Sequence, residues 1–297
     1  MTKLEKTQIN PIANVLNIFL IGLYAFTCIY PLWYIAINSV SSSMAIGNGV
    51  FLLPVGFNLE AYRQMLDISG LNSAIFISIA RTVSGALLST FCASFMAYII
   101  TRRHMLARKF IYRFLIFTMY FSGGFIPTYV LLSALGFRNN FLVYIVPGAI
   151  SAFNIIMVKT YIESMPASLW ESAEIDGAGV MRIYYKLIVP LTMPILACLI
   201  VWSAVGQWNS WTDDLFYMLG SKARNLHCLQ FMLYRVMQTN AAVALRNNPM
   251  SAASGIDVPP EGLRMAMSFI TVLPILCVYP FMQRYFTKGI MLGAIKG

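Results

Sequence analysis

The sequence predicts an all-α integral membrane protein with six transmembrane helices. Of its 297 residues, 59% are hydrophobic and only 11% are charged, and the mean hydropathy is +0.70. Soluble domains carry about 25% charged residues, so most of this chain is expected to face lipid or neighbouring helices. Six apolar runs approach or exceed the roughly 17 to 25 residues that cross a bilayer as a helix. The runs are continuous rather than alternating, which favours helices over barrel strands.

The six predicted spans are separated by polar segments of unequal length. They cover residues 13–37, 72–100, 114–136, 141–158, 190–212 and 265–283. The first follows a charged N-terminal stretch and is longer than the apolar region of a signal peptide, so we expect it to be retained. Residues 1–297 are therefore expected to form a single transmembrane domain.

The distribution of Lys and Arg predicts the orientation in the membrane. An even number of spans places both termini on one side. If that side is the cytoplasm, the inner segments hold almost twice as many Lys and Arg as the outer ones, and the densest cluster lies in the short turn 101–109 (TRRHMLARK). Cytoplasmic loops carry the excess of basic residues, so both termini are expected to be cytoplasmic.

Two outer segments, 38–70 and 213–264, are too long to be simple turns. In the first, NLEAYRQML at 58–66 is expected to form a short helix at the membrane interface. In the second, LHCLQFMLYRVMQ at 226–238 has apolar residues near helical spacing. The remainder, 239–262, is rich in Asn, Ser, Gly and Pro and is expected to be an exposed loop.

The inner segment 159–190 is the polar interruption between the fourth and fifth spans. Ser164 is expected to cap a helix that holds Pro166 in its first turn and ends at the glycines that begin with Gly177. Three carboxylates are expected late in this helix, where the helix dipole does not favour them. They are Glu171, Glu174 and Asp176.

A second short helix is expected after the reversal at Gly177, over residues 181–189, with Pro190 opening the fifth span. Segment 159–190 is thus predicted to project a pair of short helices into the cytoplasm. Nothing in its composition marks it as a membrane span.

Enzymatic, metal-binding and nucleic-acid functions find little support in the sequence. The two histidines, His104 and His227, are predicted on opposite sides of the membrane, and the five cysteines form no CxxC pair. No Gly-x-x-x-x-Gly-Lys-Ser/Thr phosphate loop is present, so the chain shows no means of binding ATP. The net charge is +10, but the basic residues punctuate apolar runs instead of clustering with aromatic residues, so nucleic acid is not an expected partner.

The spacing of residues 171–190 resembles the EAA loop of permease subunits in ATP-binding-cassette (ABC) importers. The family pattern is Glu-Ala-Ala, three residues, Gly, nine residues, Ile, one residue and Leu-Pro. The corresponding residues here are Glu171, Ser172, Ala173, Gly177, Leu187, Val189 and Pro190. Only Ser172, Leu187 and Val189 differ from the pattern, and each keeps the small or apolar character of the residue it replaces. Two further stretches, 121–136 (FSGGFIPTYVLLSALG) and 288–297 (KGIMLGAIKG), resemble the carbohydrate importers of the maltose type and its complex-oligosaccharide branch.

The resemblance implies a type I ABC importer permease fold and a subunit that moves oligosaccharides across the cytoplasmic (inner) membrane of a bacterium. It implies that the cytoplasmic loop couples the chain to a separate ATPase. The coupling residues would be Glu171, Ser172, Ala173, Asp176, Gly177 and Pro190. The chain itself would carry no cofactor, because ATP and Mg would bind to the ATPase. The expected partners are a second permease subunit, a dimeric ATP-binding subunit and an extracytoplasmic sugar-binding protein, toward whose cleft residues 240–262 would reach.

Polar residues within or beside the spans are candidates for a translocation pathway. They are Arg81, Asn154, Gln207, Trp208 and Asn209. Arg81 is costly in a span unless it is paired or faces water, so pairing between helices is an equally open role, and polar interhelical packing accounts for the others as well as sugar binding does. Asp213 and Asp214 are expected at the outer mouth, in contact with water.

An ion-coupled secondary transporter of small solutes is the alternative function. Such a transporter is expected to hold carboxylates within its spans or inverted repeats with broken helices. No Asp or Glu lies deep within any predicted span. An ATPase-coupled permease therefore remains the better interpretation.

Overall fold

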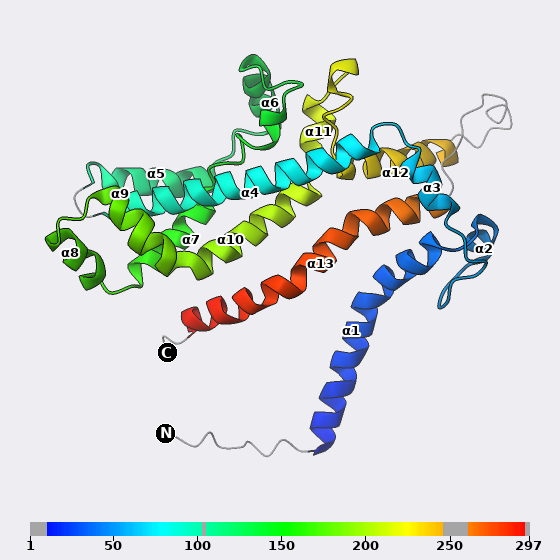
Figure 1. Ribbon diagram of the computed structural model, residues 1–297, viewed down its shortest axis with the longest axis horizontal. Coiled ribbons are helices and arrows are strands. Elements are labelled where there is room, and N and C mark those ends of the chain that lie inside the picture. Colours follow the sequence, from blue (N-terminus) through cyan, green and yellow to red (C-terminus); the bar gives the residue numbers. More distant parts are fainter. Residues whose placement is uncertain (1–10, 103–104, 246–260, 295–297) are drawn as a thin grey trace. The chain divides into compact units, whose positions relative to one another are not determined.

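The computed structural model describes residues 11–102, 105–245 and 261–294, and the regular elements in those ranges are all helices (Figure 1). The predicted all-α class is therefore confirmed. The chain divides into two compact units, Met1–Ile68 with Val236–Val272, and Ser69–Arg235 with Leu273–Gly297. A single transmembrane domain over 1–297 stays a prediction.

The first unit holds one long helix followed by two short ones. These are α1 (Pro11–Ser39), α2 (Ser43–Asn48) and α3 (Glu60–Leu66). The loop between α2 and α3 returns to the end of α1, where Trp33 Nε1 donates a hydrogen bond to the Leu52 carbonyl at 3.0 Å. The Ser39 and Tyr62 hydroxyls lie 2.7 Å apart and join α1 to α3. The helix predicted at 58–66 is thus confirmed.

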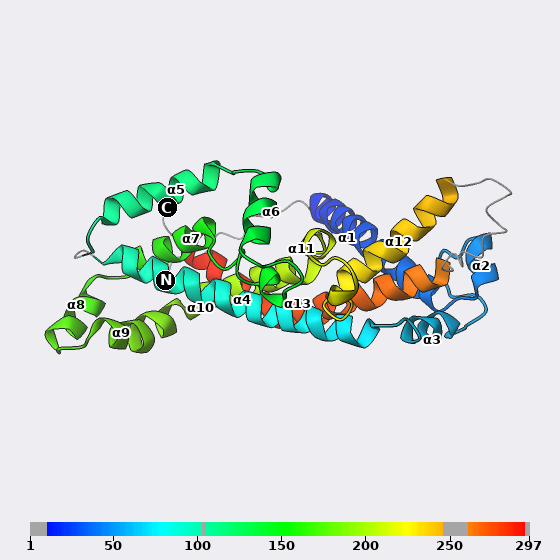
Figure 2. The same cartoon turned by 90° about the horizontal axis from the view of Figure 1, so that it is seen from above.

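The second unit is built around α4 (Leu71–Thr101), which packs along α7 (Ala152–Glu163) and α10 (Val189–Asn209). Ala93 and Ala97 on α4 are almost completely buried, and such small side chains let membrane helices approach closely. Ile155 and Val158 of α7 and Leu199 of α10 are at most 1% exposed and complete this core. Figure 2 shows α5 (Arg108–Tyr120) along the other side of α7.

Four helices are long and apolar enough to cross a membrane in the described part of the chain. They run over Ile12–Ser39, Leu71–Thr101, Val180–Asn209 and Glu261–Pro280. These helices match the predicted first, second, fifth and sixth spans. The last belongs to α13 (Glu261–Ala294), which passes from the first unit into the second.

The two central spans differ from the prediction of one continuous helix each. Residues 114–136 are broken into α5 and α6 (Phe125–Ala134), which are bent by 115° relative to each other. The break contains Gly124, whose φ of +85° is a conformation that glycine adopts without strain. Residues 141–158 form a short 3₁₀ turn, η1 (Phe141–Tyr144), and α7 only begins at Ala152. Pro147 lies in the gap, and its missing N–H and fixed φ oppose a continuous helix there.

In the described part of the predicted outer segment, three further helical elements follow α10. They are α11 (Thr212–Tyr217), the 3₁₀ turn η3 (Ser221–Ala223) and α12 (Leu229–Leu245). The helical spacing at 226–238 correctly predicted α12, although the helix extends further. Most of the predicted loop at 239–262 lies outside the described residues.

Candidate functional site

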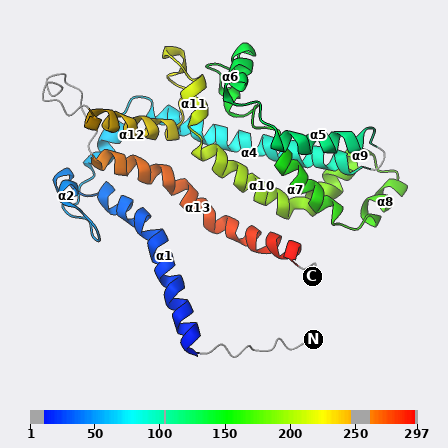
Figure 3. The same cartoon turned by 180° about the vertical axis from the view of Figure 1, so that it is seen from behind.

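The predicted cytoplasmic loop contains α8 (Ser168–Ile175), which projects from one end of the second unit (Figure 3). The prediction that Ser164 caps the start of this helix is wrong. α7 continues to Glu163, and Ser164 caps the C-terminus of α7 instead. The Ser164 hydroxyl donates to the Tyr161 carbonyl at 2.7 Å. Pro166 correspondingly lies before α8 and not in its first turn.

Glu171 lies in the first turn of α8, so its predicted position late in the helix is wrong. Because the helix N-terminus favours negative charge, this carboxylate is compatible with the helix dipole. Gly177 ends the helix with a φ of +74°. The amide of Ala178 donates to the Ala173 carbonyl at 3.0 Å and completes the reversal. The predicted turn at Gly177 is thus present.

The exposed surface of α8 carries polar side chains together with Ile175, which is 86% exposed, whereas another side of the helix packs inward. Glu171, Ser172 and Asp176 are exposed, while Ala173 is partly buried against the core of the second unit. The proposed coupling residues from Glu171 to Gly177 therefore lie on one short projecting helix and its terminal turn. Pro190 is separate from them, in the first turn of α10.

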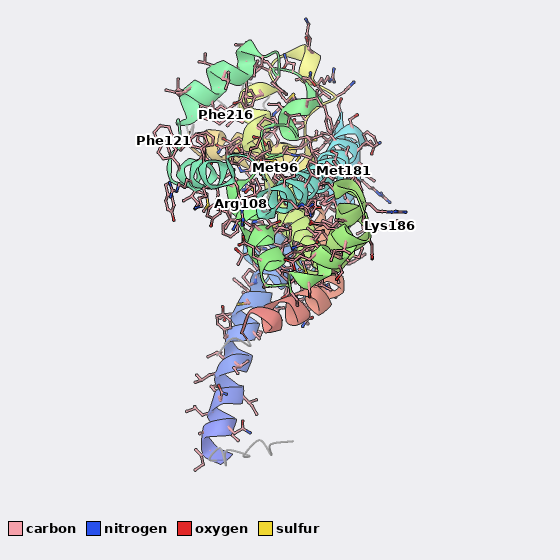
Figure 4. All side chains as sticks on the ribbon, turned by 90° about the vertical axis from the view of Figure 1, so that its left-hand side faces the viewer. Met96, Arg108, Phe121, Met181, Lys186 and Phe216 are labelled. Atoms are coloured by element: carbon pink, nitrogen blue, oxygen red, sulfur yellow. The ribbon has the colours of Figure 1, made fainter. Side chains whose placement is uncertain are left out.

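The segment after Gly177 is continuous with the fifth span, which corrects the prediction of a separate second helix. α9 (Val180–Ile183) leads into a π-helical turn, η2 (Tyr184–Ile188), and then directly into α10. The Val189 amide donates to the Tyr184 carbonyl, five residues earlier. Pro190 has no amide to offer to the regular ladder, and the wider turn lies immediately before it. Met181 and Lys186, labelled in Figure 4, are exposed at this end of the unit.

A buried lysine fastens the neighbouring helices at the same end. Lys159 of α7 is 7% exposed, and its ammonium lies 2.6 Å from Glu163 and over the Tyr112 ring at 4.3 Å. Glu163 also pairs with Arg108 of α5 at 3.0 Å. A cavity of about 320 Å³ lies between these pairs and α8. These contacts therefore join α5 to α7 beside a cavity that α8 also borders.

Arg81 of α4 is 1% exposed, and each of its three guanidinium nitrogens has a hydrogen-bond partner. Nε and Nη2 donate to Gln207 Oε1 at 3.2 and 3.1 Å, and Nη1 donates to the Ser210 carbonyl at 3.1 Å. Nη2 also lies 2.8 Å from Asp213 Oδ2. The guanidinium carbon stands 4.3 Å from the centre of the Tyr144 ring. Arg81 is thus paired with groups on α10 and α11, one of the two roles considered for it.

Three of the five predicted pathway residues line one polar cavity of about 310 Å³ in the second unit: Arg81, Asn154 and Gln207. Hydroxyl groups and the Trp202 ring complete much of the lining. The other two predicted residues lie elsewhere. Trp208 faces a separate apolar cavity of about 100 Å³, and Asn209 is exposed. The cavity offers the hydrogen-bonding groups and aromatic surface that a sugar requires.

Asp214 is completely buried, so the prediction that it contacts water is wrong. Its carboxylate accepts a hydrogen bond from the Cys228 amide at 2.6 Å and lies 2.6 Å from His227 Nδ1. Asp213 is also engaged, because it pairs with Arg81. These contacts join α11 to the start of α12, and no spacing in the sequence signals them. In the described ranges, no three His, Cys, Asp or Glu are grouped to hold a metal ion.

The Cys228 thiol, outside the membrane-spanning helices, is expected to resist alkylation. Burial, reinforced by the Asp214 carboxylate, raises its pKa to about 12. At pH 8 its thiolate fraction would be on the order of 10³-fold below that of a thiol with the usual pKa of about 8.5. Maleimide labelling followed by peptide mass spectrometry should modify Cys228 only after denaturation. Equal labelling rates in the folded and denatured protein would contradict this.

Comparisons with known proteins cover nearly the whole chain. Residues 85–292 match the family described as "Binding-protein-dependent transport system inner membrane component". The chain is 32% identical to the polygalacturonan/rhamnogalacturonan transport system permease protein YtcP of Bacillus subtilis (strain 168), over 93% of this chain and 95% of that protein. It is 33% identical to Protein LplC of the same strain, over 99% and 98%.

A solved structure is similar along the same length. It is described as a bacterial ABC transporter involved in the import of the acidic polysaccharide alginate, and one of its chains matches with a TM-score of 0.79 and 30% identity. The match covers 93% of this chain and 96% of that chain. A second chain, from the alginate transporter in complex with a pentasaccharide-bound periplasmic protein, matches with a TM-score of 0.55 and 15% identity, and so supports the fold alone.

Proposed function

This chain belongs to the binding-protein-dependent transport system inner membrane component family, and on that premise we propose how it works as a permease subunit of an oligosaccharide ABC importer. It is a multi-pass membrane protein. We assign ATP binding and hydrolysis, with Mg, to a separate dimeric subunit. A second permease subunit and an extracytoplasmic sugar-binding protein complete the assembly. The relatives named for polygalacturonan and rhamnogalacturonan and for alginate support polymeric sugars as the substrate class.

The observation that carries the coupling role is the projecting helix α8. It exposes Glu171, Ser172 and Asp176, ends sharply at Gly177, and joins through α9 and η2 directly to α10. A short exposed helix of this kind fits a groove on a soluble ATPase, and the unbroken connection lets a displacement of α8 reach the membrane. This arrangement supports a cytoplasmic location of α8, and the distribution of Lys and Arg in the sequence supports the same side for both termini.

The polar cavity in the second unit is proposed as this chain's wall of the translocation pathway. Arg81, Asn154 and Gln207 lie on its surface, and the Arg81 charge is balanced by Asp213. Alternating access requires the permease to exchange between an inward-facing and an outward-facing state. ATP can shift this equilibrium only if the ATP-bound ATPase binds one of the two states more tightly than the other. Ion coupling finds no support here, because the buried carboxylate of Asp214 lies in α11, beyond the end of α10.

Gly177→Val is expected to reduce ATP-dependent uptake at least tenfold without preventing membrane insertion. Valine at a φ of +74° is strained, so the turn after α8 must change direction. The measurement is uptake into vesicles holding the complete importer, together with recovery of the ATPase on affinity-purified permease. The sugar supplied would be oligogalacturonate, with maltooligosaccharide as a neutral comparison.

Gly179→Val is the matched control. Both glycines have open space around the position of a Cβ, but Gly179 has a φ of −68°, which valine tolerates. Uptake by this variant is expected to stay within about twofold of the unmodified protein, as for surface changes that remove no interaction. If Gly177→Val also transports normally with a normally bound ATPase, the coupling role of α8 is wrong.

A further inference from the structure

Two successive turns of α4 and the residue that caps its C-terminus present polar groups to the segment that follows α7. Ser94 and Tyr98 are four residues apart and so lie on one face of α4, and Arg102 follows just past the end of the helix, where the backbone is extended. The contacts are Ser94 Oγ with Tyr184 OH at 2.5 Å, Tyr98 OH with the Val180 carbonyl at 3.0 Å, and Arg102 Nη1 with Glu174 Oε1 at 2.6 Å. We call these three contacts the polar ladder. Its partners belong in turn to η2, α9 and α8.

The innermost contact of the polar ladder is buried, and the middle one is partly buried. Ser94, Tyr98 and Tyr184 are at most 3% exposed. A buried hydroxyl that loses its partner costs free energy, since water cannot replace the lost bond. The tyrosine rings also contact each other, with centroids 5.5 Å apart. These rungs therefore hold α9 and η2 at one register against α4.

The outer rung reaches the projecting helix itself. Arg102 is 19% exposed and Glu174 36% exposed in their side chains. The guanidinium carbon of Arg102 lies 5.5 Å from the centre of the Tyr98 ring, so the outer rung rests on the middle one. This pairing also accounts for Glu174, a carboxylate that the dipole of α8 does not favour at its position.

The same helix carries the polar cavity. α4 runs unbroken from Leu71 to Thr101. Arg81 and Ser89, which precede Arg102 in the sequence, lie on the cavity wall. At 1.5 Å per residue, Arg81 and Arg102 lie about 30 Å apart along the helix axis. A displacement of α8 that pulls on Arg102 thus acts at the C-terminal cap of a continuous helix whose other half lines part of the cavity.

We propose that the polar ladder is a second transmission route, in which Arg102 and Glu174 position α8 on α4 and carry its motion to the cavity wall. This route operates in parallel with the covalent route through α9, η2 and α10. It rests on the proposed docking of α8 on the ATPase. Arg102 and Glu174 are positioning residues, because neither lines the polar cavity.

Charge exchange tests the outer rung. Arg102→Glu, Glu174→Arg and the double exchange are placed in the full importer, in a background without the five native cysteines. Ser203 lines the polar cavity, and Ser203→Cys serves as the reporter on its wall. The readout is the rate at which a water-soluble maleimide labels this cysteine with and without ATP plus vanadate. Recovery of the ATPase with the permease is measured in parallel.

We expect nucleotide to change the labelling rate at least fivefold with the original pair, and less than twofold in either single variant. The double exchange should restore the larger change, since it re-forms the ion pair with reversed polarity. A merely structural role would not yield this restoration together with normal ATPase recovery in all variants. Single variants that respond like the original pair, or a double exchange that fails to restore the response, would overturn the proposal.

Two further variants keep the result decisive. Lys109→Glu makes the same change of charge in the same basic cluster at an exposed position of α5, and it should leave the response unchanged; loss of the response there would assign the effect to net charge. If Arg102→Glu does not fold, the milder Glu174→Gln should weaken the response, and an unchanged response overturns the proposal. Absence of ATPase, or of any nucleotide response with the original pair, would instead count against the proposed function of α8.

Discussion

Asp213→Ala is expected to destabilise the folded protein by about 3–5 kcal/mol, the usual cost of leaving a buried charge without its partner. The guanidinium of Arg81 is 1% exposed with Asp213 in place, and without it would keep only neutral partners, the acceptors Gln207 and Ser210 and the ring of Tyr144. Arg81→Met should cost less, because the Asp213 side chain is 36% exposed and can be hydrated. The measurement is thermal unfolding of the purified importer in detergent, with uptake assayed alongside.

The double variant Arg81→Met, Asp213→Ala separates the effect of an unpaired charge from the effect of losing the hydrogen bonds of Arg81. It removes both ions, so we expect it to recover most of the stability lost in Asp213→Ala. Uptake should remain low in the double variant if the cavity wall depends on Arg81 to hold Gln207. Equal destabilisation in all three variants would show that the ion pair is not what stabilises this region.

Asp214→Ala is expected to destabilise the folded protein by about 1–3 kcal/mol through a different cause, the loss of a buried hydrogen-bond acceptor. The completely buried carboxylate accepts from the Cys228 amide and lies beside His227. Alanine leaves that amide buried without an acceptor and opens a space where α11 meets α12. Denaturant unfolding of the purified complex measures the loss.

Asp214→Asn serves as the isosteric comparison. Its amide oxygen can still accept from the Cys228 backbone, so the loss in stability should be smaller than for alanine. Because the Asp214 charge helps to raise the pKa of the Cys228 thiol, asparagine should also increase maleimide labelling of Cys228 at pH 8. Unchanged labelling in a folded Asp214→Asn protein would contradict the electrostatic role of Asp214.

Hydropathy predicted the spans that are straight helices and failed where the backbone breaks. The runs 72–100 and 190–212 are apolar and contain no residue that forces a bend, apart from prolines that α10 accommodates, and both are present as helices. The runs 114–136 and 141–158 are just as apolar, but Gly124 and Pro147 divide them. The hydropathy of a run is a sum over side chains, so it does not include the backbone conformations that glycine and proline impose. The same limitation placed Ser164 at the start of a helix, when it closes the preceding one.

A site residue could be predicted where its own type and its neighbours in the sequence indicate its role. A contact between two residues far apart in the sequence could not. A charge within a span marked Arg81, and a glycine after a short polar helix marked Gly177. The partner of Arg81 is 132 residues away in the sequence, and the partner of Glu174 lies at the C-terminal cap of α4. The carboxylate of Asp214 looked like a surface group because nothing local indicates the turn that buries it.

The separation of Arg81 from Asp213 also has a consequence for biosynthesis. At about 5–20 residues per second, the ribosome takes on the order of ten seconds to add the 132 residues that lie between them. Until then α4 must enter or remain at the membrane with an unneutralised guanidinium, at about 2.5–3.5 kcal/mol if it is centrally placed. The helix α1 has no such dependence, because its Thr27 hydroxyl bonds to its own helix. Because Asp213 is made late, the Arg81 charge is neutralised only after most of the chain has been synthesised.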